Sequence, residues 1–175
     1  MSLRSLFEWL DALPSSLALR ESLNAYPILL TSHVVSMCLF VGLIAFWDLR
    51  LVGITLKRVP VSNIPSRLFP LAIAGFVITS ITGLLLFYSQ PMRFYGNFYF
   101  WFKNVLMFVA GVNALAFHLT TYHSVAAWDS DVVTPFTARL AGALSLAVWA
   151  GVVVTGRLIA YSGLMPDWWN GLNIN

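Results

Sequence analysis

Charged residues are scarce in this sequence. Asp, Glu, Lys and Arg together make up 10% of the 175 residues, whereas a typical soluble domain carries roughly a quarter. Hydrophobic residues make up 59%, and the mean hydropathy is +0.79. So few charges cannot cover the surface of a water-soluble domain of this length. The composition therefore predicts one domain, residues 1–175, that is embedded in lipid.

Several other features are missing, and each absence excludes a class of site. Cys38 is the single cysteine, which excludes an intramolecular disulfide and a cysteine-rich metal centre. The sequence has no glycine-rich phosphate loop and no Ser-His-Asp order of a soluble hydrolase. Its net charge of +3 comes from scattered residues, and no basic run or basic-aromatic patch suggests a nucleic-acid partner.

Four apolar stretches are long enough to cross the hydrocarbon core, which requires about 20 helical residues. They occupy residues 26–48, 66–89, 98–122 and 137–161. Prolines and charges separate them, and aromatic clusters of the kind found at membrane interfaces flank the third span and follow the fourth. The sequence therefore predicts an all-α protein, an integral membrane four-helix bundle.

A different pattern precedes the first span, in residues 3–13. Its apolar residues recur at helical spacing, and charged residues occupy the opposite face until Pro14 interrupts the pattern. The apolar residues of this segment are Leu3, Leu6, Phe7, Leu10 and Leu13. We predict an amphipathic helix that lies on the membrane surface.

The orientation depends on one charged loop, because basic residues are equally numerous on the two sides. Arg50, Lys57, Arg58 and Arg67 lie close together between the first two spans. Short loops rich in Lys and Arg usually stay in the cytoplasm. This predicts that both termini lie outside the cytoplasm.

Polar side chains inside the spans are candidate functional residues, because burying them in lipid is costly. His33, Lys103, Met107 and Arg157 all lie toward the same side of the membrane as the termini, given that successive spans alternate in direction. A haem needs an imidazole for the iron, an apolar slot and cations for its propionates. We therefore predict a haem b site with His33 as the metal ligand.

His118 does not fit the same iron. Its depth differs from that of His33 by roughly 15 Å at the helical rise, so Met107 is the alternative sixth ligand, or no sixth ligand exists. His118 and His123 could instead mark a second site near the opposite surface. Simpler roles stay open: His33 as a hydrogen-bonding residue between helices, Met107 in ordinary packing, and Lys103 and Arg157 extending to the headgroups.

Asp48 and Arg50 flank the end of the first span. We interpret them as a charge pair that anchors this helix end and not as catalytic groups. No acidic residue is expected deeper in the bilayer, which gives secondary transport little support.

The motifs of the spans also resemble known families. The run from Leu30 through His33 to Gly42, the Asp48-Leu49-Arg50-Leu51 end, Thr82-Gly83-Leu84 and the segment from Lys103 to His118 resemble uncharacterised small bacterial four-helix membrane proteins. More distantly, the arrangement is similar to HemJ-type protoporphyrinogen oxidases and CopD-type membrane domains. The HemJ resemblance implies a four-helix haem b protein in which His33 is the haem ligand and Lys103 the matching lysine.

Three functional hypotheses follow. The first is a haem b protein that transfers electrons within the membrane, with quinone as a possible partner. The second is a cofactor-free accessory or anchor subunit that docks a larger membrane or periplasmic partner through its surface helix and Trp168-Trp169, or that forms a homo-oligomer. The third is a copper-handling membrane protein.

Overall fold

The computed structural model describes residues 2–162, and every regular element within them is a helix. Trp168 and Trp169 lie outside the described residues. The elements in chain order are α1 (Leu3–Asp11), α2 (Pro14–Glu21), α3 (Ala25–Val52), α4 (Asn63–Ser89), α5 (Pro91–Tyr95), α6 (Phe98–Thr120), the 3-10 helix η1 (Tyr122–Ala127) and α7 (Phe136–Tyr161).

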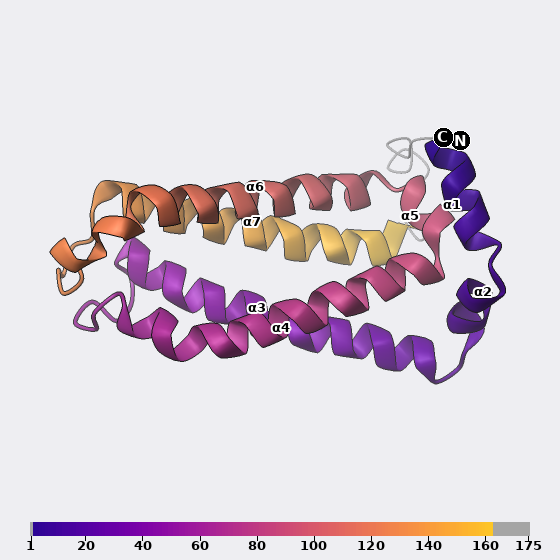
Figure 1. Ribbon diagram of the computed structural model, residues 1–175, viewed down its shortest axis with the longest axis horizontal. Helices are drawn as coiled ribbons and strands as arrows, with labels where there is room; N and C mark the ends of the chain where they lie inside the picture. The colour runs from indigo at the N-terminus through magenta and orange to yellow at the C-terminus, as the bar shows by residue number, and fades with distance from the viewer. Residues whose placement is uncertain (1, 163–175) are drawn as a thin grey trace.

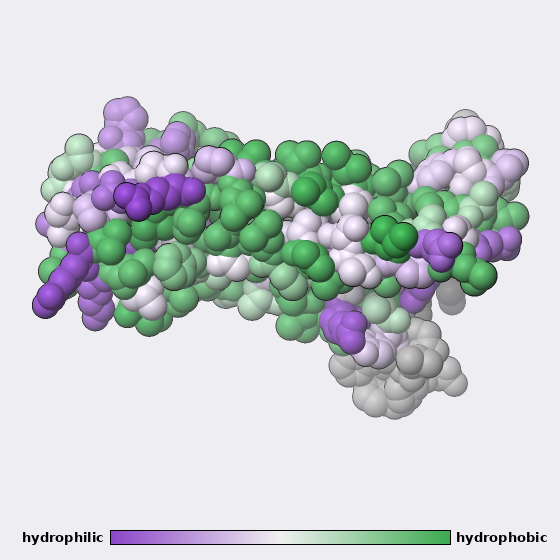
Figure 2. Space-filling model, turned by 90° about the horizontal axis from the view of Figure 1, so that it is seen from below, coloured by the Kyte–Doolittle hydropathy of each residue, from purple (hydrophilic) through white to green (hydrophobic). Residues whose placement is uncertain are grey.

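The four long helices α3, α4, α6 and α7 have 28, 27, 23 and 26 residues, so each is long and apolar enough to cross a membrane. They run side by side along the length of the molecule (Figure 1). On the face shown in Figure 2, hydrophobic side chains cover most of the middle, and most hydrophilic ones lie toward the two ends. The predicted all-α four-helix membrane bundle is confirmed, and the protein is a multi-pass membrane protein.

The bundle consists of two helix pairs, α3 with α4 and α6 with α7, and it is joined mainly by contacts between α3 and α7. Small residues allow the close approaches. A Cβ atom on Gly75 of α4 would lie 3.2 Å from the backbone oxygen of Ser36 and 3.3 Å from the Cβ of Phe40. A Cβ on Gly151 of α7 would lie 3.0 Å from Leu106. Such contacts are typical of helices packed in membranes.

A close contact between the two pairs is at Gly142 of α7. A Cβ there would meet the backbone oxygen of Asp48 and the Cβ of Leu51, both at 3.0 Å. We expect Gly142→Ala to destabilise the bundle by about 1–3 kcal/mol, because the backbone of α3 must shift. Gly111→Ala is the matched control, since its Cβ meets nothing within 4 Å and alanine favours the helix. Equal thermal midpoints for the two variants in detergent would contradict this prediction.

The N-terminal segment crosses one end of the bundle (Figure 1). The helix predicted over residues 3–13 corresponds to α1, which ends at Asp11, and a second short helix that was not predicted, α2, follows with Pro14 as its first residue. Phe7 of α1 is buried, and its ring lies 5.3 Å from that of Phe87 and 5.1 Å from that of Tyr95. Trp9 on the same helix is 55% exposed. The helix thus both packs on the bundle and presents apolar surface outward.

The opposite end is closed by the two connections between spans. Arg50 is fully buried there, and its guanidinium donates hydrogen bonds to the backbone oxygens of Val59 (2.9 Å) and Asp131 (3.0 Å). The carboxylate of Asp129 accepts hydrogen bonds from the backbone N–H and the hydroxyl of Ser62. Arg50 forms no ion pair with Asp48 within residues 2–162. The predicted charge pair is therefore replaced by a guanidinium that joins the two loops.

Helix boundaries at this end differ from the prediction. α4 begins at Asn63 and contains Pro65 in its first turn, where proline is tolerated because the first N–H groups have no intrahelical partner. The third span ends at Thr120, and a 3-10 helix follows where the prediction continued to residue 122.

Candidate functional site

Two apolar cavities lie end to end inside the bundle, each lined by α3, α4, α6 and α7. The His33 cavity, toward the α1 end, has a volume of about 530 Å³, and the Asp48 cavity, toward the loops, about 560 Å³. Both volumes are in the range of small-molecule sites, about 300–1,000 Å³. The residues that line both cavities and so separate them are Phe40, Phe76, Ser80, Met107 and Trp149.

The imidazole of His33 is held by α4. Its Nδ1 lies 3.1 Å from the backbone oxygen of Thr79 and 3.1 Å from the hydroxyl oxygen of Thr82. The Thr82 hydroxyl donates its own hydrogen to the backbone oxygen of Ile78, at 2.6 Å. Both neighbours of Nδ1 are therefore acceptors, so Nδ1 must carry the hydrogen. The other ring nitrogen, Nε2, then holds a free lone pair.

That tautomer is the one that metal-binding histidines use. A ligating imidazole commonly donates its second N–H to a backbone carbonyl, which fixes the ring and its tautomer. Within residues 2–162, Nε2 of His33 has no hydrogen-bond partner, and the side chain lines the His33 cavity. The arrangement can therefore supply a neutral, oriented nitrogen ligand.

Gly83 makes room for this ring. A Cβ at residue 83 would lie 3.0 Å from Cε1 and 3.5 Å from Nδ1 of His33. The imidazole therefore packs directly on the backbone of α4, and a Cβ at this position would press against the ring. The sequence prediction noted His33 but not its dependence on Gly83, which becomes visible only when α3 and α4 are paired.

Among residues 2–162, Lys103 is the single cationic side chain that lines the His33 cavity, and no acidic side chain of this range lines it. Its Nζ lies 3.8 Å from a Cβ built on Gly156 of α7, so the ammonium extends across the face of that helix. Neither of the ion pairs within residues 2–162 includes Lys103. An unpaired ammonium among apolar walls is costly unless an anion or water accompanies it. The cavity is therefore complementary to an anionic group.

The remaining predicted residues divide between the cavity and the surface. Met107 lines both cavities, at their junction. Arg157 is exposed and bonds to the hydroxyl of Tyr161 at 2.8 Å, with its guanidinium over the same ring. His118 is exposed near the loop end, and its ring is stacked on that of Tyr122. The structure thus brings together His33, Lys103 and Met107, and it leaves Arg157 and His118 outside both cavities.

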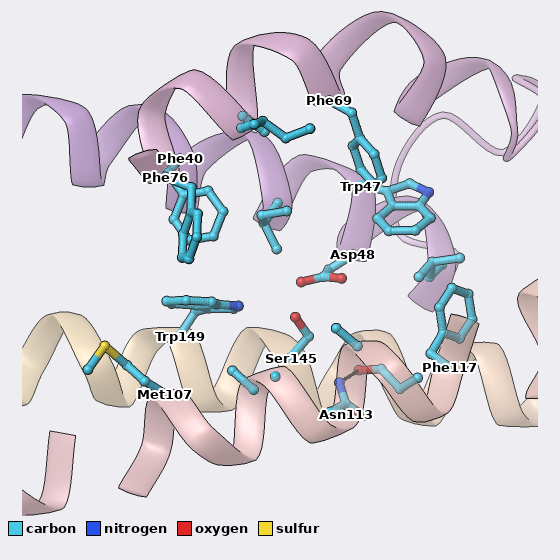
Figure 3. A pocket seen from close by; sticks show the side chains of 18 of the residues that line it. Phe40, Trp47, Asp48, Phe69, Phe76, Met107, Asn113, Phe117, Ser145 and Trp149 are labelled. Atoms are coloured by element: carbon cyan, nitrogen blue, oxygen red, sulfur yellow. Dashed lines mark hydrogen bonds between the residues drawn. The ribbon is translucent and has the colours of Figure 1, made fainter. Parts of the chain in front are cut away.

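Asp48 is the functional candidate that the sequence prediction interpreted differently. It is 3% exposed and lines the Asp48 cavity, with the Ser145 hydroxyl across from its carboxylate (Figure 3). Phe40 and Ile44, eight and four residues earlier on α3, line the same cavity. That i, i+4 spacing places Asp48 on the inward face of the helix, and it is the sequence signal that could have indicated this position.

No group of three or more His, Cys, Asp or Glu side chains is arranged to hold a metal ion within residues 2–162. A cofactor that brings most of its own ligands, as haem does, needs only one or two protein ligands.

Comparison with known proteins gives a family. A model of a family of unknown function, DUF6644, matches residues 24–162, which include all four spans. The chain belongs to this family. No curated protein and no solved structure matches the chain. The match begins at the start of α3, so α1 and α2 lie outside the segment that defines the family.

Proposed function

We propose that this DUF6644 protein binds haem b in the His33 cavity and transfers electrons within the membrane. The observation that carries the proposal is the His33 imidazole: its Nδ1–H is directed to the backbone oxygen of Thr79, which leaves Nε2 as the nitrogen for iron. The apolar cavity of about 530 Å³ beside it supports the same conclusion. When bound, haem would supply the one-electron chemistry.

The residues of the chain would bind and orient the group. His33 would ligate the iron, and Lys103 would neutralise a propionate. Phe7 of α1, which also lines the His33 cavity, would exclude water from its outer end. Met107 lies at the inner end of the cavity and is the available side chain for a sixth ligand. The resemblance to HemJ-type proteins points to the same two positions, His33 and Lys103, although porphyrinogen oxidation is not part of this proposal.

The deciding experiment is the absorption spectrum of the purified protein. The full chain should be produced in cells supplied with haem and solubilised in mild detergent. Its spectrum is then recorded before and after addition of dithionite. We expect a Soret band and a b-type α band on reduction, with stoichiometric haem after extraction. A helical, monodisperse protein without these bands would overturn the proposal.

A protein without haem would fit the second hypothesis, a cofactor-free anchor subunit. The exposed apolar side chains of α1, including Leu3 and Trp9, suit a membrane surface or a partner equally. A partner that stays bound in stoichiometric amount through purification, together with the absence of haem, would favour the anchor. We place the protein in the bacterial inner membrane with its termini outside the cytoplasm, which a reporter fused to the N-terminus would test.

Lys103 and Arg157 provide a matched pair for testing the cation in the site. We expect Lys103→Met to weaken haem binding about tenfold or more, because a hydrogen bond to a charged group contributes about 1.5–3 kcal/mol. Arg157→Met should change the affinity by less than about twofold, since this side chain is exposed and bonded to Tyr161. Titration of haem into the apo forms measures both. Equal losses for the two variants would mean that Lys103 does not contact the ligand.

A further inference from the structure

The Asp48 cavity holds an acidic group that the proposed haem site does not use. Asp48 is the only charged residue of the described part of the chain that lines this cavity, and its carboxylate points into the space between α3 and the pair α6 and α7 (Figure 3). It is 3% exposed, and its Oδ2 is buried with no hydrogen-bond partner in the described part of the chain. A buried carboxylate is strongly disfavoured unless a donor or a cation accompanies it.

The chain offers Asp48 no cation among residues 2–162. Arg50 is close in sequence, but its guanidinium is directed to the backbone oxygens of Val59 and Asp131. Lys103 lines the other cavity. The two ion pairs in the described residues both lie in the N-terminal segment, between Arg4 and Glu8 and between Arg20 and Asp11.

Two further polar side chains of the cavity, Asn113 and Ser145, can accept hydrogen bonds from a ligand. The side-chain amide of Asn113 donates one N–H to the backbone oxygen of Ala141, at 3.0 Å, and its amide oxygen is available to accept a hydrogen bond. Ser145 faces the Asp48 carboxylate (Figure 3), and a hydroxyl directed to a carboxylate leaves its oxygen as an acceptor. A ligand in this space therefore meets one negative charge and these acceptors, together with one unpartnered donor, the buried Nε1–H of Trp47.

The walls are aromatic, which suits a cation with an apolar body. Trp47, Phe69 and Phe117 lie on the loop side of the cavity, and Trp149 lies on the side toward the His33 cavity (Figure 3). The faces of aromatic rings attract ammonium groups, most strongly where water is excluded. The His33 cavity has the opposite character, because its charged group is the Lys103 ammonium.

We propose that the Asp48 cavity is a second ligand site, which binds a lipophilic ammonium ion. The ligand is a primary or secondary amine that carries an aromatic or alkyl group; its N–H⁺ donates to the carboxylate of Asp48, and its apolar body fills the aromatic space. This site is separate from the haem site and does not require haem to be bound.

Three probes with the same hydrocarbon body test the proposal on the wild-type protein. The probes are 4-phenylbutylamine, 4-phenylbutanol and 4-phenylbutyrate, which present a cation, a neutral hydroxyl and an anion. Equilibrium dialysis of the protein in nanodiscs, against empty nanodiscs, measures their affinities. We expect the amine to bind about tenfold or more tightly than the alcohol, and the carboxylate to bind most weakly. Equal binding of amine and alcohol would overturn the proposal and indicate an acyl-chain crevice.

Two variants locate the site. Asp48→Asn keeps the shape of the side chain and removes its charge, so the amine should lose about tenfold or more in affinity while the alcohol is little affected. Gly111→Leu should weaken the binding of both probes, because residue 111 lines the cavity and faces open space where leucine would extend. Unchanged amine binding in a helical Asp48→Asn protein would overturn the proposal. If that variant does not fold, the comparison of probes on the wild type decides alone.

Discussion

Replacing His33 with alanine is expected to remove the b-type spectrum completely from the purified protein. Among the described residues, His33 is the only histidine that lines the His33 cavity. Its orientation is fixed by Thr79 and Thr82, and loss of an oriented ligand leaves only apolar contacts to retain the group. The measurement is the haem content per protein and the reduced-minus-oxidised spectrum.

His118→Ala is the matched control for this experiment. It removes an exposed imidazole that is stacked on Tyr122 near the opposite end, so the spectrum should be unchanged. Added imidazole should restore a b-type band to His33→Ala, because the truncated side chain leaves room for a free ligand in the cavity. A His33→Ala protein with a wild-type band would exclude His33 as the iron ligand. If the band is lost in His118→Ala instead, the haem site is at the loop end of the bundle, near His118.

A substitution at Thr82 tests the orientation of the His33 ring without removing the ring itself. In Thr82→Val the hydroxyl that accepts from Nδ1 is lost, but the backbone oxygen of Thr79 remains at 3.1 Å. The band should therefore persist with a lower affinity for haem, because losing a group that hydrogen-bonds to a ligating histidine typically changes metal affinity 10–100-fold.

Much of the fold was predictable because lipid imposes a simple requirement. Each span must satisfy its backbone groups within one helix, so long apolar stretches such as residues 66–89 could be assigned by length alone. The residues at which helices begin were less predictable. Pro14 ends the predicted surface helix but also starts α2, and Pro65 lies inside the first turn of α4. Proline is accepted both in the first turn of a helix and in a loop, so the local sequence does not distinguish the two.

The sequence predicted how deep the candidate residues lie in the membrane, but not the direction in which their side chains point. Helical rise placed His33, Lys103, Met107 and Arg157 toward one side of the membrane, but it gave no information on which helix faces pack together. Gly156 faces Lys103 on α6, and Arg157, one residue later, is turned by about 100° around the helix axis. It therefore points outward to Tyr161. The depth of a residue in the membrane follows from its position along one helix, whereas the direction of its side chain relative to the site depends on how that helix packs against its neighbours.

Asp48 and Arg50 illustrate the same limit at the loop end. Two residues apart on a helix, their side chains point in directions about 200° apart. The carboxylate faces the interior cavity, and the guanidinium faces the loops. A charge pair was the natural interpretation of the sequence, but neighbours at this spacing do not face each other on a helix.

Arg50→Ala is expected to destabilise the bundle by about 3 kcal/mol or more. The guanidinium is fully buried and bridges the two loops through Val59 and Asp131. A hydrogen bond from a charged donor contributes about 1.5–3 kcal/mol, and the substitution removes two of them and leaves a cavity. Nη1 is buried without a partner within residues 2–162, and its removal offsets part of the loss. The thermal midpoint in detergent, followed by circular dichroism, measures the effect.

Arg58→Ala is the control, because Arg58 is exposed in the same loop and surface substitutions usually change stability by less than about 0.5 kcal/mol. Arg50→Lys should recover only part of the stability, since one ammonium cannot match the geometry of the guanidinium fork. Near-equal midpoints for Arg50→Ala and Arg58→Ala would show that the hydrogen bonds of Arg50 to the two loops do not stabilise the bundle.

At temperatures below its thermal midpoint, the Arg50→Ala protein should keep the b-type band, because 17 residues of α3, about 25 Å of helix, separate Arg50 from His33. Loss of stability without loss of the band would establish that the loop end holds the bundle together independently of the haem site.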